Sequence, residues 1–110
     1  MLVEFELNGQ KFSGLNGGPQ TTFNDAVSVV VPCADQAEVD YYWTHLADGG
    51  GEGVACGWLK DKFGLRWQIV PSRLFEMIAD RDTEKAGRAT QAMLGMTKLD
   101  IAALEQAYAG

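Results

Sequence analysis

The residues able to act as nucleophiles or as soft metal ligands are few. The chain contains one histidine, His45, and two cysteines, Cys33 and Cys56. A single imidazole excludes most zinc sites and Ser-His-Asp schemes unless a second chain contributes. We expect His45 to be a surface residue near the end of a helix, and both cysteines to be small buried hydrophobes. The alternative is a reactive thiolate at Cys33, because a helix is predicted to begin directly after it.

A second group of residues combines aromatic rings with hydrogen-bonding side chains. Trp58 and Trp67 lie in two apolar segments, 54–59 and 65–70, that a short polar loop separates. If these segments are antiparallel neighbours, the two tryptophans either line one wall of a cleft or pack in the core. Ligand clefts are mostly apolar and carry a few polar groups. The candidate ligand-binding residues are Gln68, Trp58, Ser28, Asn16 and Arg66.

Arg66 directly precedes Trp67 in the same predicted strand. Because side chains alternate between the two faces of a strand, Arg66 is predicted to point away from Trp67. Its guanidinium is expected either to clamp an anionic substrate or to pair with a surface glutamate.

The first residues of the chain predict a β-hairpin. Apolar residues alternate with glutamates between Val3 and Leu7, a pattern typical of a half-buried strand. Asn8-Gly9 follows, and this pair tolerates the positive φ angles of a type I′ turn. Residues 2–16 are therefore predicted to form a hairpin. Two strands alone are marginal in water, so this hairpin must add to a larger sheet.

The rest of the chain predicts one strand, one helix, two strands and three helices. The β-branched residues 26–31 are typical of a buried strand. Asp35 with Glu38 forms a D-x-x-E capping box, and an apolar stripe predicts a helix over 36–47 that a run of glycines ends. The stripe consists of Val39, Tyr42, Trp43 and Leu46. The N-cap candidates of the last three helices are Ser72, Asp82, and Thr97 together with Asp100. The whole order is an α+β pattern.

A resemblance to a known family is carried chiefly by the block Cys56–Pro71, CGWLKDKFGLRWQIVP. This block resembles the PhnB-like branch of the vicinal oxygen chelate superfamily, the glyoxalase/bleomycin-resistance/dioxygenase fold. Members of this branch often carry the label 3-demethylubiquinone 3-methyltransferase. The resemblance extends over nearly the whole chain, through residues 5–10 with 15–19, 33–43 and 98–104.

The resemblance implies a fold in which two βαβββ modules form a cleft for a metal ion or a small ligand. It implies that residues 1–110 are a single domain, with 26–71 as the second module and 72–110 as a helical tail. Residues 2–16 match only the last two strands of the first module. Unpaired edge strands expose backbone hydrogen-bonding groups. We therefore expect a homodimer in which the sheet edges of two subunits pair, or in which the subunits exchange their N-terminal hairpins. The alternative is a monomer whose C-terminal helices cover the exposed face.

The resemblance also bears on metal binding. Metal-dependent relatives hold a divalent cation with His, Gln and Glu side chains from both modules. Gln68 matches the last-strand ligand position, where Glu is usual, and no histidine stands near Ala26 or Ser28. A neutral amide is a weak donor to a hard cation, so no family-type metal site is expected. No cofactor is predicted either, because the chain has no glycine-rich nucleotide-binding motif for S-adenosylmethionine.

Composition narrows the partners. The chain has 9 basic and 15 acidic residues among 110, a formal net charge of −6, which argues against nucleic acid and anionic membranes. No apolar stretch approaches a membrane span, and two free cysteines suit the cytoplasm. We therefore expect a small-molecule-binding protein with its ligand between modules or subunits and with unassigned catalytic residues. The alternatives are a metal-assisted lyase or isomerase completed by a second subunit, and a non-catalytic module for drug sequestration or oligomerisation.

Overall fold

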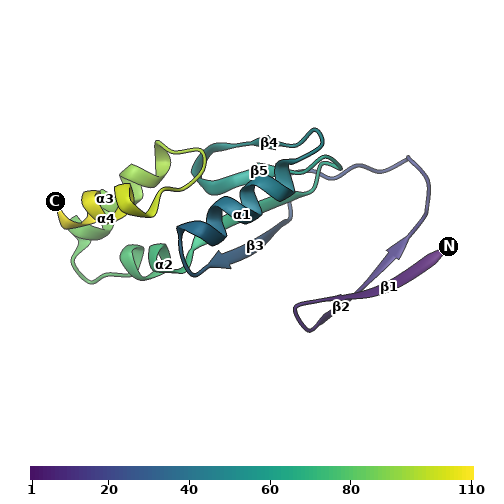
Figure 1. Ribbon diagram of the computed structural model, residues 1–110, viewed down its shortest axis with the longest axis horizontal. Coiled ribbons are helices and arrows are strands. Elements are labelled where there is room, and N and C mark those ends of the chain that lie inside the picture. Colours follow the sequence, from purple (N-terminus) through teal and green to yellow (C-terminus); the bar gives the residue numbers. More distant parts are fainter.

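The computed structural model describes residues 1–110 as a projecting hairpin and a larger body (Figure 1). The Cα radius of gyration is 16.2 Å and the principal extents are 53 × 27 × 25 Å. A compact domain of this length has a radius of gyration of about 13 Å. The excess comes from the hairpin, which stands away from the sheet and helices at the N-terminal end of the molecule.

The hairpin consists of β1 (Leu2–Leu7) and β2 (Gln10–Leu15), paired antiparallel in a two-stranded sheet of their own. Asn8 and Gly9 have φ angles of 49° and 82°, as a type I′ turn requires. The predicted hairpin is confirmed, but within one chain it joins no larger sheet. Residues 16–27 connect it to the body without helix or strand.

The body contains one βαβββ module. Its strands are β3 (Ser28–Cys33), β4 (Glu52–Gly53), β5 (Trp58–Lys60) and β6 (Arg66–Pro71), in the sheet order β3-β6-β5-β4. The outer strand β3 runs parallel to β6, and the other pairs are antiparallel. With α1 (Gln36–Ala47) between β3 and β4, this topology confirms the predicted α+β class and module.

Several elements differ from the prediction. The strand expected to be buried over 26–31 is β3, Ser28–Cys33, and most of it is exposed because only one of its faces packs beneath α1. The short strand β4, in which Glu52 pairs with Lys60, was not predicted. The segment expected as a strand from residue 54 instead makes a 3₁₀ turn, Ala55–Gly57, before β5 begins. Cys56 there has a φ of 64°, which no strand permits.

Helix α1 covers one face of the sheet (Figure 1). It begins as predicted at Asp35, whose carboxylate accepts a hydrogen bond from the Glu38 backbone N–H at 2.9 Å. The Glu38 carboxylate reaches the Ala34 backbone N–H at 2.7 Å rather than the N–H of the cap residue. The core beneath α1 consists of Cys33, Val39, Leu59 and Ile69, with Val31, Trp43, Leu46 and Trp67 packed against them. Tyr42 lies outside this core and is exposed.

The C-terminal helices α2 (Ser72–Ile78), α3 (Thr83–Leu94) and α4 (Ile101–Ala109) gather at the end of the body opposite the hairpin (Figure 1). They enclose a second core of Val70, Leu74, Met77, Ala89, Leu99 and Leu104. Asp82 and Asp100 cap α3 and α4. Ser72 was wrongly predicted as a cap, because Pro71 holds that position and Ser72 is already helical. None of the helices is long and apolar enough to span a bilayer.

Candidate functional site

The candidate site is the face of the sheet that α1 does not cover. Trp67 and Ile69 of β6 pack beneath α1, so their alternating neighbours point to the opposite side. The strand register places Trp58 opposite Gln68 and Lys60 opposite Arg66. We call this surface the open face, and its central residues are Ser28, Val30, Trp58, Lys60, Arg66 and Gln68.

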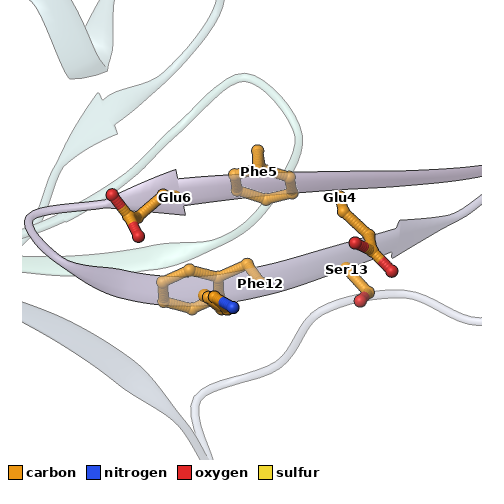
Figure 2. Close-up of a pocket in the computed structure, with 6 residues that line it drawn as sticks. Glu4, Phe5, Glu6, Phe12 and Ser13 are labelled. Atoms are coloured by element: carbon orange, nitrogen blue, oxygen red, sulfur yellow. The ribbon is translucent and has the colours of Figure 1, made fainter.

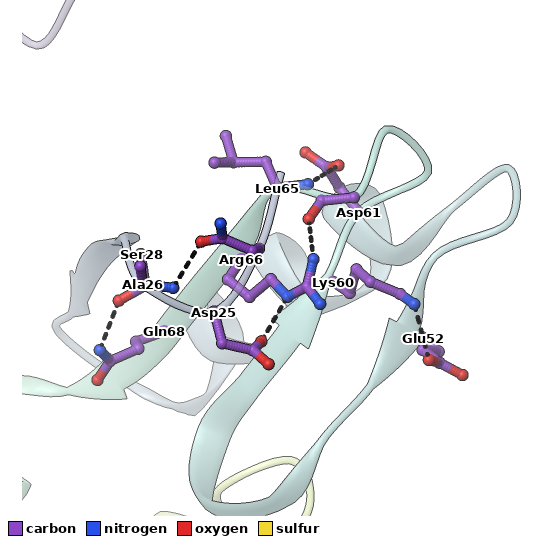
Figure 3. Close-up of polar contacts among 11 residues, drawn as sticks. Asp25, Ala26, Ser28, Glu52, Lys60, Asp61, Leu65, Arg66 and Gln68 are labelled. Carbon is purple, nitrogen blue, oxygen red and sulfur yellow. Dashed lines mark hydrogen bonds and ion pairs between the residues drawn. The ribbon is translucent and has the colours of Figure 1, made fainter. Parts of the chain in front are cut away.

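A hydrogen bond joins two of the predicted ligand-binding residues. The Gln68 side-chain amide donates to the Ser28 hydroxyl at 2.8 Å, from β6 to β3 (Figure 3). Both side chains are half-buried, and the Gln68 carbonyl oxygen accepts no hydrogen bond from the chain. The pair therefore fixes the amide and leaves its acceptor free at the middle of the open face.

Two cationic side chains, those of Arg66 and Lys60, lie at the end of the open face nearest the connecting segment 16–27. The Arg66 guanidinium donates to the Asp25 carboxylate at 2.6 Å and to the Gly64 carbonyl at 2.5 Å (Figure 3). The predicted surface glutamate is therefore an aspartate. Lys60 pairs with Glu52 at 3.3 Å. The Asp25 side chain is 82% exposed, whereas that of Arg66 is 19% exposed, so solvent reaches this ion pair from the Asp25 side.

The two tryptophans lie on opposite faces of the sheet. Trp58 pairs with Gln68 on the open face, whereas Trp67 pairs with Leu59 beneath α1. The Trp67 indole N–H donates to the Asp61 carboxylate at 2.9 Å, which holds the ring in the core. The expectation of one wall lined by both rings is therefore wrong, and the expectation of a core position holds for Trp67.

Asn16 is the one predicted site residue that lies elsewhere. It follows β2 at the base of the hairpin, where its backbone N–H donates to the Met1 carbonyl at 3.0 Å. Its side chain is exposed and lies away from the open face. The structure thus brings together Gln68, Trp58, Ser28 and Arg66 and leaves Asn16 outside this group.

A small pocket at the far end of the open face was missed by sequence reasoning. It measures about 180 Å³ and lies between the sheet residues Trp58, Gln68 and Val70 and the helix residues Phe75, Ile78 and Met93. The available signal was a second apolar stripe on α2. Leu74 and Met77 fill the core, so Phe75 and Ile78, one position further along, face outward.

The cysteines and the histidine contribute little nucleophilic chemistry. Cys33 is buried, as expected, and burial together with the Glu38 and Asp35 carboxylates raises the pKa of its thiol to about 11. A reactive thiolate at Cys33 is therefore contradicted. Cys56 is half-exposed rather than buried, at the edge of the small pocket. His45 is exposed on α1, as predicted, with Nδ1 2.8 Å from the Tyr41 carbonyl oxygen.

The donor atoms on the open face do not fit a divalent cation within one chain. They are an amide, a hydroxyl and two cationic groups, and no three His, Cys, Asp or Glu side chains of the chain cluster to hold a metal ion. A neutral amide and a hydroxyl are weak ligands for a hard divalent cation, and the nearby Asp25 and Glu52 carboxylates are paired with Arg66 and Lys60. The loss of the family-type site in the assembled protein stays a prediction, which metal analysis of the purified protein tests.

The hairpin carries a surface that nothing in the chain covers. Phe5 and Phe12 stack across the strands with ring centroids 5.6 Å apart (Figure 2). Glu4, Glu6 and Ser13 lie around a hollow of about 560 Å³ on the same strands. Only β1 and β2 bound this hollow, so it is an open surface of the hairpin rather than an enclosed site.

The topology and the open face define a module of the glyoxalase-like α+β class. A family model described as 3-demethylubiquinone-9 3-methyltransferase matches residues 1–70. The chain therefore belongs to this family, in the PhnB-like glyoxalase superfamily, as its sequence resemblance indicated. The match contains the hairpin and the module, and α2, α3 and α4 lie beyond it. No curated protein matches the chain.

Proposed function

We propose that this protein binds a small organic molecule on the open face of its sheet. The observation that carries the proposal is the placement of Ser28, Trp58, Arg66 and Gln68 on one uncovered face. An aromatic wall, a fixed amide and a guanidinium are the mixture of apolar and polar groups that ligand sites use. The other face of the same sheet is filled by α1 and offers no such site.

Each residue suggests a role in that binding. Trp58 offers an apolar surface for stacking. Gln68 offers its side-chain carbonyl oxygen as an acceptor, and the hydrogen bond from its amide to Ser28 fixes the direction of that oxygen. Arg66 attracts a carboxylate or another planar anion, which takes the place of Asp25. The favoured ligand is therefore a small amphiphilic acid.

Tryptophan fluorescence tests this proposal directly, because the two faces of the sheet provide a matched pair of variants. Small aryl carboxylates, with benzoate and phenylacetate first, are titrated into the protein while emission and melting temperature are followed. We expect quenching and a raised melting temperature in the parent protein and in Trp67→Phe, and loss of the quenching in Trp58→Phe. An unchanged response in Trp58→Phe rules out binding on the open face.

We also propose that the second copy of the chain covers the hairpin in a homodimer. Six large apolar residues of the hairpin are exposed: Leu2, Val3, Phe5, Leu7, Phe12 and Leu15. A two-stranded hairpin is marginal in water by itself, and β3 offers a free parallel-sheet edge. The hairpin of a second copy, placed along this edge, supplies a second wall beside the open face. The ligand then lies between the two subunits.

Native mass spectrometry tests the dimer with two matched double variants. Phe5 and Phe12 are opposite each other, as are Glu6 and Lys11, and the two pairs point to opposite faces of the hairpin. We expect the Phe5→Ser/Phe12→Ser protein to be monomeric and the Glu6→Ser/Lys11→Ser protein to stay dimeric. A parent protein that is monomeric at micromolar concentration refutes the proposal.

A further inference from the structure

We infer that the helices beyond the family region build an apolar subsite for a ring-sized group at one end of the open face. The inference rests on the proposed function, because it assigns the part of the ligand that lies farthest from Arg66. Its residues come from two sources. Trp58 and Gln68 belong to the segment that the family model matches, whereas Phe75, Ile78 and Met93 follow it.

The size of the subsite selects a single ring or a short branched chain. Its volume is about 180 Å³. An apolar cavity of about 150 Å³ is known to stay dry and to bind benzene. Seven of its eight lining residues are hydrophobic. Met93 has a flexible thioether that adapts its shape to an aromatic edge.

The position of Phe75 and Ile78 at the opening of the subsite accounts for two exposed apolar side chains on α2. Phe75 and Ile78 are each 44% exposed, although α2 already contributes Leu74 and Met77 to the core. These two side chains flank the opening and gain cover when an apolar group enters. The additional burial of apolar surface favours binding.

The direction of β6 sets the length of the ligand. Val70, Gln68 and Arg66 follow one another on the same face of this strand, at steps of about 7 Å. A ring seated between Val70 and Gln68 therefore places a carboxylate at Arg66 only when a short linker separates the two groups. This spacing indicates an arylalkyl carboxylate of the length of 3-phenylpropionate.

Methyl NMR on methionine-labelled protein tests the subsite, because Met93 lies in it and the chain has only four methionines. The probes are 3-phenylpropionate, propionate, which lacks the ring, and 3-phenylpropan-1-ol, which lacks the charge. We expect both ring-bearing probes to shift the Met93 methyl signal, with the acid at least tenfold tighter than the alcohol. Propionate is expected to leave the signal unchanged.

Two tryptophan variants separate the subsite from the rest of the face. Ile78→Trp fills the opening, and Leu94→Trp is the control, because Leu94 is 53% exposed on α3 and does not line the pocket. We expect Ile78→Trp to weaken 3-phenylpropionate binding at least tenfold and Leu94→Trp to leave it unchanged.

The outcomes distinguish the two proposals. If 3-phenylpropionate quenches Trp58 but leaves the Met93 methyl unshifted, the subsite is overturned and the open-face proposal stands. If 3-phenylpropan-1-ol shifts the Met93 methyl signal, but the fluorescence response to every carboxylate is the same in Trp58→Phe as in the parent protein, the subsite stands. The proposed open-face function is then overturned. If no probe shifts Met93, the subsite is overturned whatever Trp58 does.

Discussion

Two antiparallel strand pairs in this chain behave in opposite ways. The pair β5–β6 has its inner face buried beneath α1, where Leu59 and Ile69 are fully enclosed. The pair β1–β2 has a comparable set of apolar residues and buries none of them. Its turn and register are nevertheless regular. The comparison teaches that alternation and a good turn define a ribbon, whereas burial depends on a partner surface that one chain supplies only for β5–β6.

Removing the hairpin gives the sharpest test of this difference. Deletion of residues 1–17 leaves both hydrophobic cores untouched, because every core residue lies beyond them. We expect the shortened protein to keep its cooperative thermal transition and to become monomeric, as measured by calorimetry and light scattering. A shortened protein that remains dimeric places the subunit interface on the body and breaks the comparison.

Truncating one aromatic residue in each region extends the comparison to stability. Trp67→Ala removes a half-buried ring from the core beneath α1 and one of the hydrogen bonds to the Asp61 carboxylate. We expect the free energy of unfolding to fall by about 3 kcal/mol, the lower end for such truncations. Phe12→Ala in the isolated hairpin is expected to cost less than about 0.5 kcal/mol in the monomer. Urea titrations at low protein concentration measure both, and equal losses contradict the division into two regions.

The N-terminus of α1 tests a smaller effect inside the body. Asp35→Ala removes the carboxylate that accepts the Glu38 N–H, and such caps contribute about 1 kcal/mol. Asp48→Ala, at the other end of the same helix, is the control, because its side chain makes no capping hydrogen bond. Urea unfolding of the two variants is expected to show a loss only for Asp35→Ala. No difference between them means that α1 is held by tertiary packing alone.

The smallest expected effect is a pH dependence within the C-terminal helices. The Tyr108 hydroxyl donates to the Asp80 carboxylate, which lowers the pKa of Asp80 and raises the pKa of Tyr108. A lowered folded pKa means that this contribution is present above the unfolded value of 3.8 and is lost as the pH falls through the folded value. We expect Tyr108→Phe to flatten the acid limb of the stability curve below about pH 4, as measured by thermal unfolding. An unchanged acid limb shows that this hydrogen bond does not contribute.

Much of the body could be predicted because its signals are local. The Asn8-Gly9 turn, the Asp35 cap and the apolar stripe of α1 each depend on neighbours within one or two turns of chain. The short strand β4 could not be predicted in this way. Its two residues are extended because β5 lies beside them, and their glycine-rich sequence has no intrinsic preference for a strand.

The candidate site was only partly predictable for the same reason. Arg66 and Gln68 share a face by simple alternation along one strand. The relation of Trp58 to Trp67 depends instead on the register between two strands, and a shift of one residue moves a side chain to the other face. The pocket beside Phe75 and Ile78 depends on how α2 packs against the sheet, which no local pattern encodes.

The segment 16–27 determines how far the hairpin can travel. It contains Gly17, Gly18 and Pro19 and no regular structure, so its ends are separated by about 20 Å on average when it is flexible. At that reach the hairpin meets its own sheet at a millimolar effective concentration, in competition with the sheet of another copy. Pairing of the hairpin with a second copy is therefore favoured only when the tether prevents the hairpin from aligning with β3 of its own chain. If the proposed homodimer forms by hairpin exchange, a shorter or stiffer tether is expected to favour it over closure within one chain.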